Sequence, residues 1–259
     1  MIQNLLHALS RRIAKPAFFL RECLFPFGCS VCGANLVGSC ESWYGLCDEC
    51  RAVIEIELCE TLAGKTCSGC GRPLVSEIGR CLSCRAKDET LGNADNSTVG
   101  SVVLFPYMGK YRNLLSAYKF GGNLALANFF AEKTLEALGR DVFREAEVVP
   151  VPPRPGRIRK TGWDQIGYLA RLLETGVGKN EGVRVNRCLR RLKSESQKEL
   201  GREKRGTNLR GRMVPVCRAP ETAVVFDDVM TTGSTLAACA ATLREGGTKT
   251  VLGLCLFWD

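Results

Sequence analysis

The chain has 259 residues, of which 45% are hydrophobic and 24% are charged, and this composition is ordinary for a soluble globular protein. It excludes a collagen-like repeat and gives no sign of a largely disordered chain. The length suits one medium-sized α/β domain with a small additional module. The formal net charge is +9, so the position of the excess positive charge has to be considered.

The N-terminal residues 1–22 are expected to form a short amphipathic helix. The apolar residues at helical spacing are Ile2, Leu5, Leu6, Leu9 and Ile13, and Pro16 ends the pattern. Basic residues interrupt every apolar run, so we expect neither a secretory signal nor a transmembrane segment. Docking on the protein's own surface is the favoured interpretation, and association with a membrane surface is the alternative.

Cysteine is concentrated near the N-terminus, where 11 of the 15 cysteines precede residue 85. Their arrangement in CxxC pairs, the odd total and the lack of a secretory signal favour metal binding over disulfides. We therefore expect a reducing environment and a cytoplasmic protein. The cysteine-rich module is expected to span residues 23–87, and a linker rich in Gly, Asn, Asp, Ser and Thr is expected at residues 88–100.

The CxxC pairs form two sets of four thiolate ligands. The first set is Cys29, Cys32, Cys47 and Cys50, and the second set is Cys67, Cys70, Cys81 and Cys84. Two CxxC turns supply the closed tetrahedral shell of a structural zinc site, so we predict two all-thiolate Zn²⁺ sites that stabilise the fold and do not catalyse. Iron–sulfur clusters or redox pairs are the alternatives.

Each set begins with a CxxC pair followed directly by a glycine, Gly33 or Gly71, which is expected to supply left-handed or closely approaching backbone. Three further cysteines in this region are interpreted as small buried hydrophobic residues, although Cys40 can also replace one of the ligands. These three are Cys23, Cys40 and Cys59.

Residues 101–259 alternate between strand-like and helical apolar segments, which predicts an α/β domain with a mainly parallel sheet and helices on its faces. The segments are 102–107, 112–120, 124–138, 147–151, 165–174, 183–187, 223–226, 236–244 and 250–257. From Leu189 to about Arg212 the sequence is polar and basic, and long loops of this kind are usually functional lids or disordered connections. We interpret it as a candidate lid.

Positive charge is concentrated between Arg154 and Arg212. This stretch holds 17 Lys and Arg residues against 6 Asp and Glu residues, a net charge of +11, whereas the rest of the chain has a net charge of −2. Such a stretch suits a polyanionic partner, either a diphosphate ligand or nucleic acid. A solvated basic face is the alternative interpretation.

Residues 224–236 combine a buried strand, two carboxylates and a hydroxyl-rich turn that opens a helix. In an open α/β sheet, ligands bind at the carboxyl ends of strands, where the following helix directs free N–H groups at an anion. Gly233 lets the backbone approach a phosphate, and hydroxyl donors come from Thr231, Thr232, Ser234 and Thr235. Asp227 and Asp228 would repel that phosphate, so we expect them to contact neutral ribose hydroxyls.

The run FDDVMTTGST at residues 226–235 resembles the signature of type I phosphoribosyltransferases. The resemblance implies that Asp227 and Asp228 hold the ribose and are the catalytic residues, and that residues 231–235 hold the 5′-phosphate. An ordinary buried strand with a polar turn is one alternative. A Walker-type nucleotide loop is another, but no Gly-Lys-Ser/Thr follows the glycine.

By the same resemblance, the strand end VVPVPPR and the basic stretch are expected to bind the diphosphate. The residues assigned to it are Pro152, Pro153, Arg154, Arg159, Lys160, Arg191, Lys193 and Arg205. Cations closing over a diphosphate stabilise charge on the leaving group and exclude water. The alternative is a basic loop in which Asp164 caps the helix at 165–174 and nothing is bound.

The chain is similar to the ComF family along almost its whole length. The similarity rests on the paired CxxC sets, Lys119-Phe120-Gly121, VPVPP, KTGWDQ and FDDVMTTGST. It implies a double zinc ribbon followed by a type I phosphoribosyltransferase domain at residues 101–259, with a link to DNA uptake in natural transformation. The sequence Thr161-Gly162-Trp163-Asp164-Gln165 departs from the family's usual Arg-Gly-Phe-Asn-Gln, and Arg159 and Lys160 can replace the missing arginine.

Three functional hypotheses follow. The leading one is Mg²⁺-dependent binding of phosphoribosyl diphosphate and transfer of the phosphoribosyl group to an acceptor that the sequence does not identify. The second is a non-catalytic protein that senses phosphoribosyl diphosphate or binds single-stranded DNA through the basic stretch. The third is an assembly factor whose zinc module binds a protein partner.

Overall fold

The computed structural model describes residues 28–36, 38–91, 100–156, 158–159, 162–176, 181–193 and 212–259. The amphipathic helix expected at residues 1–22 and Cys23 lie outside these ranges. Among the residues that are described, no helix has the length and apolar character needed to cross a membrane.

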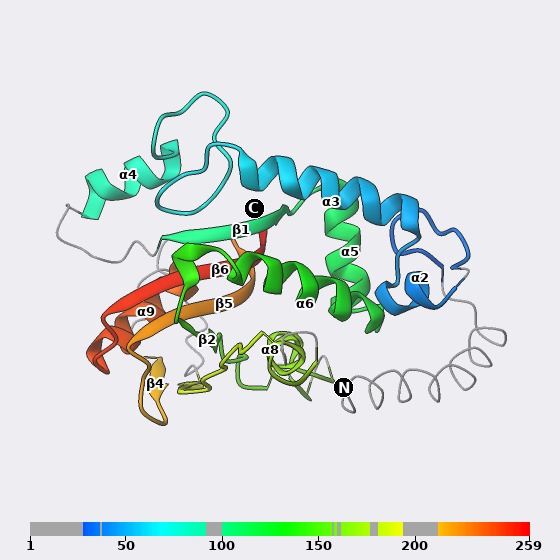
Figure 1. Ribbon diagram of the computed structural model, residues 1–259. Coiled ribbons are helices and arrows are strands. Elements are labelled where there is room, and N and C mark those ends of the chain that lie inside the picture. Colours follow the sequence, from blue (N-terminus) through cyan, green and yellow to red (C-terminus); the bar gives the residue numbers. More distant parts are fainter. Residues whose placement is uncertain are drawn as a thin grey trace, which may run out of the picture.

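The centre of the fold is a sheet of four parallel strands in the order β1-β6-β5-β2 (Figure 1). The strands are β1 (Ser101–Pro106), β2 (Glu147–Pro150), β5 (Thr222–Met230) and β6 (Thr250–Trp258). Parallel strands need crossover connections, and helices supply most of them here. The predicted α/β fold with a mainly parallel sheet is confirmed.

Helices cover both faces of this sheet. On one face lie α5 (Gly109–Lys119), α6 (Ala125–Leu138) and α8 (Gln165–Thr175), and on the other lies α9 (Ser234–Glu245) (Figure 1). Side chains alternate along β5: Val224 and Phe226 pack with α5, α6 and α8, whereas Val225 packs with α9. Each strand of the sheet is therefore apolar on both sides, as parallel sheets require. A 3₁₀ turn, η1 (Asp141–Phe143), precedes β2.

Two short strands, β3 (Leu189–Arg191) and β4 (Met213–Pro215), form a separate antiparallel ladder. They bring together the two ends of the candidate lid, whose residues 194–211 lie outside the described ranges. The apolar segment at 183–187 is not a full strand, because only Val185 makes an isolated parallel bridge, to Val148.

The cysteine-rich part contains three helices, α2 (Ser39–Tyr44), α3 (Asp48–Ala63) and α4 (Leu82–Leu91). α2 and α4 lie at opposite ends of the molecule, and α3 runs between them beside the edge strand β1 (Figure 1). With 16 residues, α3 is about 24 Å long. α4 extends past Lys87, so the expected linker begins as helix, and residues 92–99 of that linker lie outside the described ranges.

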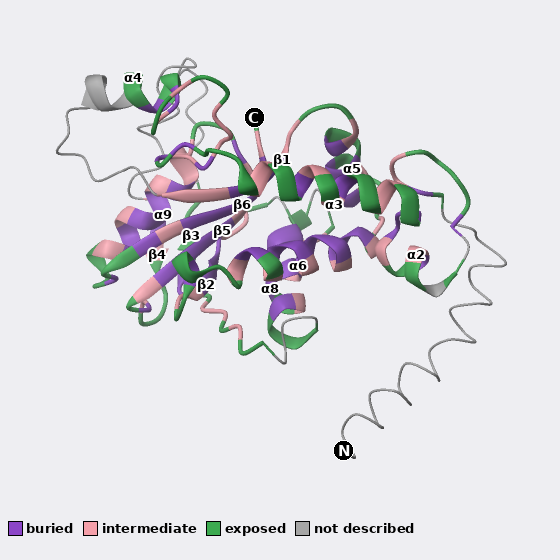
Figure 2. Ribbon diagram, turned by 45° about the horizontal axis from the view of Figure 1, so that its top comes forward, coloured by how far each residue is buried: buried purple, intermediate pink, exposed green. Residues whose placement is uncertain are grey.

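The first half of the cysteine-rich part shares the main hydrophobic core. Leu46, Ile54 and Leu58 are buried in the same cluster as residues of α5, α6 and β1. Figure 2 shows buried segments on α3, α5 and α6. The second half forms a small separate cluster whose buried residues are Cys67, Cys81 and Cys84. The boundary at residue 87 stays a prediction, but packing divides the cysteine-rich part along α3.

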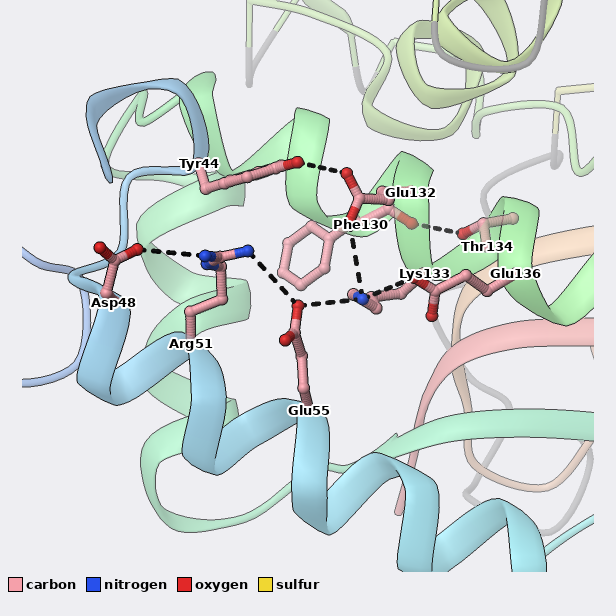
Figure 3. Close-up of polar contacts among 9 residues, drawn as sticks. All are labelled: Tyr44, Asp48, Arg51, Glu55, Phe130, Glu132, Lys133, Thr134 and Glu136. Carbon is pink, nitrogen blue, oxygen red and sulfur yellow. Dashed lines mark hydrogen bonds and ion pairs between the residues drawn. The ribbon is translucent and has the colours of Figure 1, made fainter. Parts of the chain in front are cut away.

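A nearly buried lysine joins α3 to α6. The ammonium group of Lys133 lies 3.0 Å from Glu55 Oε1 on α3 and 2.6 Å from Glu136 Oε1 on its own helix (Figure 3). Burial lowers the pKa of Lys133, but the ion pairs with Glu136 and Glu55 outweigh burial and raise it. The lysine therefore stays charged between the two helices.

Two further side chains extend this network toward α2. Arg51 lies 3.8 Å from Glu55 and 3.1 Å from Asp48, and its guanidinium stacks over the ring of Tyr44. The Tyr44 hydroxyl donates to Glu132 on α6 (Figure 3). These contacts hold the first half of the cysteine-rich part against the α/β domain.

Replacing Lys133 by Met is expected to lower the free energy of unfolding by about 1–3 kcal/mol, because the substitution leaves Glu55 and Glu136 beside a partly desolvated site without a counter-charge. Urea unfolding measures this change. The control is Lys249→Met, which removes an ion pair of 2.5 Å whose side chains are 75% and 71% exposed. Because solvent screens this exposed pair, its loss is expected to leave stability almost unchanged, and equal losses in both variants would contradict the role given to Lys133.

Candidate functional site

The predicted cysteine ligands come together in two clusters. In each set of four, all the sulfur atoms lie within 4.8 Å of one another. The Sγ atoms of Cys32 and Cys47 are 3.7 Å apart, as are those of Cys70 and Cys81. A sulfur tetrahedron around zinc, with bonds of about 2.3 Å, has edges of about 3.8 Å. Both clusters therefore fit the predicted structural zinc sites.

The two clusters are built in the same way. The first CxxC pair of each is a tight turn in which the N–H of Gly33 or Gly71 donates to the carbonyl of Cys29 or Cys67, at 2.9 and 2.8 Å. Both glycines have positive φ, 76° and 71°, as expected. The second pair stands at the start of a helix, α3 or α4, where the positive end of the helix dipole favours thiolates.

Backbone amides also favour ionisation of one thiol in each cluster. Burial raises the pKa of Cys29, but the N–H groups of Cys32, Cys47 and Val31 outweigh it and bring the pKa down to about 7. In the second cluster, amides of Cys81, Cys70 and Gly69 likewise outweigh burial and lower the pKa of Cys67 to about 6. A thiolate is the form that binds a metal ion.

Two of the three spare cysteines are described, and neither belongs to a cluster. Cys40 on α2 and Cys59 on α3 are exposed, so the expectation that they are buried hydrophobic residues is wrong.

The second candidate site lies at the carboxyl ends of the adjacent parallel strands β5 and β2. After β5, the hydroxyl loop (residues 231–235) turns into α9, with Gly233 at the N-cap and a φ of 73°. A side chain at Gly233 would meet no described atom within 4 Å, so glycine is needed for its backbone conformation and leaves the loop open. A hollow of about 20 Å³ is lined by Asp227, Thr231, Gly233, Ser234, Thr235 and their apolar neighbours. Thr232 accepts a 3.4 Å hydrogen bond from the N–H of Ser234.

Asp227 and Asp228 lie in β5, which continues to Met230 and is longer than the sequence indicated. Successive residues of a strand point to opposite faces, and the two carboxylates do so here. Asp227 interacts electrostatically with Arg191 and with Cys239 on α9. Asp228 pairs with Lys119 on α5. The two carboxylates therefore have different neighbours, Arg191 on one side of β5 and Lys119 on the other.

The turn after β2 borders a larger and basic pocket of about 530 Å³. Five of the eight residues assigned to the diphosphate line it, namely Pro152, Pro153, Arg154, Arg159 and Arg191. Pro155, Gly156, Ile158, Leu189 and Arg190 complete the lining. Lys193 is described but does not line the pocket, and Lys160 and Arg205 lie outside the described residues.

Electrostatics connect this basic pocket to β5. Burial lowers the pKa of Arg191, and the nearby charge of Arg154 lowers it further, while Asp227 acts in the opposite direction. Like charges gathered around a half-buried guanidinium are unfavourable until an anion joins them. The pocket is therefore suited to an anionic ligand.

Asp164 acts as the helix cap that the sequence suggested. Its Oδ1 accepts a hydrogen bond of 3.0 Å from the N–H of Gly167 at the start of α8. The neighbouring Trp163 packs edge-on against Tyr118, with ring centroids 4.8 Å apart. Burial raises the pKa of Tyr118, and the nearby Tyr168, Asp228 and Asp164 raise it further. The segment that packs on Tyr118 therefore lies close to Asp228.

Lys119 is the residue that the site assignment from the sequence missed. Its ammonium group lies 2.5 Å from Asp228 Oδ2, although the two residues are far apart in the chain. The only signal in the sequence was the motif Lys119-Phe120-Gly121, which gave no indication of a partner.

Metal analysis of the purified protein is expected to give two zinc ions per chain, and Cys67→Ser to reduce this number to one, since a structural site needs its four thiolates. Cys59→Ser is the matched control, because Cys59 is exposed and outside both clusters. Elemental analysis by plasma mass spectrometry measures the content. Two ions retained in Cys67→Ser would contradict the assignment.

Comparison with known proteins shows a similarity to a competence protein. No family model matches the chain. The competence protein ComFC of Streptococcus pneumoniae (strain ATCC BAA-255 / R6) is 24% identical over 207 residues, which cover 80% of this chain and 84% of ComFC. This similarity over most of both proteins, together with the two four-cysteine clusters, supports the resemblance of the chain to the ComF family.

Proposed function

We propose that the protein binds phosphoribosyl diphosphate together with Mg²⁺ and transfers the phosphoribosyl group to an acceptor. The observation that carries this proposal is the junction at Asp227, which borders the hydroxyl loop on one side and interacts with Arg191 of the basic pocket on the other. One ligand carrying a monophosphate, a sugar and a diphosphate matches these three features in order.

The hydroxyl loop suits the 5′-phosphate. It offers the N–H groups at the start of the 12-residue helix α9 and the hydroxyls of Thr231, Ser234 and Thr235 around the hollow. Backbone amides and the helix dipole favour an anion at this position. Asp227 also borders the hollow, so a sugar hydroxyl next to the phosphate is its natural partner.

The basic pocket suits the diphosphate. Its volume of about 530 Å³ is open to a group larger than a single phosphate, and Arg154, Arg159 and Arg191 line it. During transfer, the bond from the sugar C1′ to the diphosphate oxygen breaks, the diphosphate leaves with the electron pair, and the acceptor forms a new bond to C1′. Fixed cations around the leaving oxygen stabilise this developing charge.

Mg²⁺ prefers oxygen ligands, so it would bind with the diphosphate and the ribose hydroxyls of the substrate, beside Asp227 and Asp228. Bound Mg²⁺ neutralises charge on the diphosphate. The only histidine in the sequence is His7, and we assign no proton-transfer role to histidine, because this reaction depends mainly on positioning and on cations at the leaving group.

Calorimetric titration with phosphoribosyl diphosphate in the presence of Mg²⁺ is expected to show one binding site per chain. Asp227→Ala and Asp228→Ala are each expected to weaken binding about tenfold or more, because each removes a charged acceptor of the sugar hydroxyls. Glu221→Ala, which removes an exposed carboxylate paired with Lys249, is the control. No heat of binding in the unmodified protein, or unchanged affinity in both Asp variants, would refute the proposal.

Activity is tested separately from binding. Release of diphosphate is measured with purine, pyrimidine and pyridine bases as acceptors. Tight binding of phosphoribosyl diphosphate with no transfer to any of these bases would contradict the proposed transferase activity. The protein would then be interpreted as a sensor of phosphoribosyl diphosphate.

The match to a competence protein favours a second function, the handling of single-stranded DNA. The basic stretch and the exposed arginines at the pocket supply the positive charge for such binding. Affinity for an oligonucleotide is then expected to fall steeply with salt. Competition by phosphoribosyl diphosphate would show that both ligands use the basic pocket, and absence of oligonucleotide binding at low salt would exclude this function.

A further inference from the structure

Lys119 and Asp228 form an ion pair at the edge of the candidate sugar site. The Nζ to Oδ2 distance is 2.5 Å, and the two side chains are only 10% and 12% exposed. Desolvation makes such a pair a weak contributor to stability, since two well-packed apolar residues often serve as well. Both groups also keep a small accessible surface, so a ligand can still reach them.

Lys119 stands at the end of α5, where residues 119–123 form a loop that is anchored on both sides. Before it, the hydroxyl of Tyr118 donates a 2.8 Å hydrogen bond to the carbonyl of Gln165 at the start of α8. After it, Asn123 Nδ2 donates a 2.8 Å hydrogen bond to Ser30 Oγ. We call residues 119–123 the anchored loop.

The second anchor belongs to the first four-cysteine cluster. Ser30 lies inside the Cys29–Cys32 turn, and its N–H donates to the carbonyl of Gly45 at 3.2 Å. Gly45 packs so closely on Asn123 that an added Cβ would lie 2.9 Å from the amide nitrogen. The metal-binding turn, the end of α2 and the anchored loop therefore meet at one point.

We propose that Lys119 is a positioning residue of the sugar site, which holds the carboxylate of Asp228 toward the ligand, and that the first four-cysteine cluster fixes the loop that carries it. This inference rests on the proposed binding of phosphoribosyl diphosphate. The proposed function alone does not require Lys119 or the contact between the first cluster and the anchored loop.

The chemistry of the pair fits a sugar hydroxyl. The ammonium group of Lys119 fixes one carboxylate oxygen, Asp228 Oδ2, by a charged contact. The carboxylate keeps Oδ1 as an acceptor. A sugar hydroxyl can thus donate to Asp228 Oδ1 while Lys119 holds Oδ2, whereas a phosphate would bring its own negative charge against the carboxylate.

The test compares ribose 5-phosphate with inorganic phosphate, because both can use the hydroxyl loop but only the sugar can use the pair. In Lys119→Met, the affinity for ribose 5-phosphate is expected to fall about tenfold or more, with that for inorganic phosphate unchanged. Lys119→Arg is expected to restore part of the loss. The control is Lys249→Met, which removes an exposed ion pair of the same 2.5 Å length. Calorimetry and phosphorus NMR measure the two affinities.

A second variant, Asn123→Ala, tests the anchor. Like Lys119→Met, it is expected to lower the affinity for ribose 5-phosphate, while the zinc content stays at two ions per chain. Affinity equal to that of the unmodified protein would overturn the part assigned to the cluster.

The outcomes separate this inference from the proposed function. If the unmodified protein binds neither phosphoribosyl diphosphate nor ribose 5-phosphate, the proposed function is wrong. If it binds both and Lys119→Met binds them equally well, only the positioning role is wrong. If Lys119→Met and Lys119→Arg weaken inorganic phosphate as much as ribose 5-phosphate, the lysine acts on the fold and the inference is also overturned.

Discussion

Parallel pairing of β5 with β2 is the constraint on which the candidate ligand site depends. The register aligns Val225 with Val149 and Phe226 with Pro150, so the two strands run in the same direction and their carboxyl ends lie at one edge of the sheet. The hydroxyl loop leaves one strand and the proline-rich turn leaves the other. Without this pairing the basic pocket and the helix N-terminus would be unrelated features, since nothing in the local sequence of either segment fixes its distance from the other.

The sequence was informative where function is carried by a short continuous segment. The CxxC spacing predicted both cysteine clusters, and the run from Phe226 to Thr235 predicted a strand, a turn and a helix in the right order. It was uninformative where two distant segments meet. Because Lys119 and Asp228 approach only after α5 packs on the sheet, their ion pair follows from tertiary structure and has no local signature. The opposite orientation of Asp227 and Asp228 was also missed, because β5 was expected to end before them.

Composition suggested one cysteine-rich module, but packing divides it into two unequal parts. Helix α3 is apolar on the side that faces the α/β domain, where Ile54 and Leu58 join the main core, and Lys133 adds a charged contact from α6. The turn at Gly71 instead lies against the start of β1, so that an added Cβ would stand 2.0 Å from the carbonyl oxygen of Ser101. The CxxC pattern predicts the ligands of each cluster, but it does not indicate which of the two clusters packs into the core of the neighbouring domain.

This asymmetry gives the two clusters different relations to the candidate ligand site. The first cluster contacts the anchored loop directly through the hydrogen bond between Ser30 and Asn123. Its helix α3 also contacts α5, because Glu57 on α3 accepts a 2.6 Å hydrogen bond from Lys110 on α5. The second cluster contacts the far end of β1 and, through Arg72, the ring of Trp258. A closed thiolate shell holds the backbone of its metal-binding turns rigidly. A structural metal therefore also fixes the position of the segments that contact these turns. Among the described residues, the first of the two shells lies one hydrogen bond away from the segment that carries Lys119, and this connects it to the candidate ligand site.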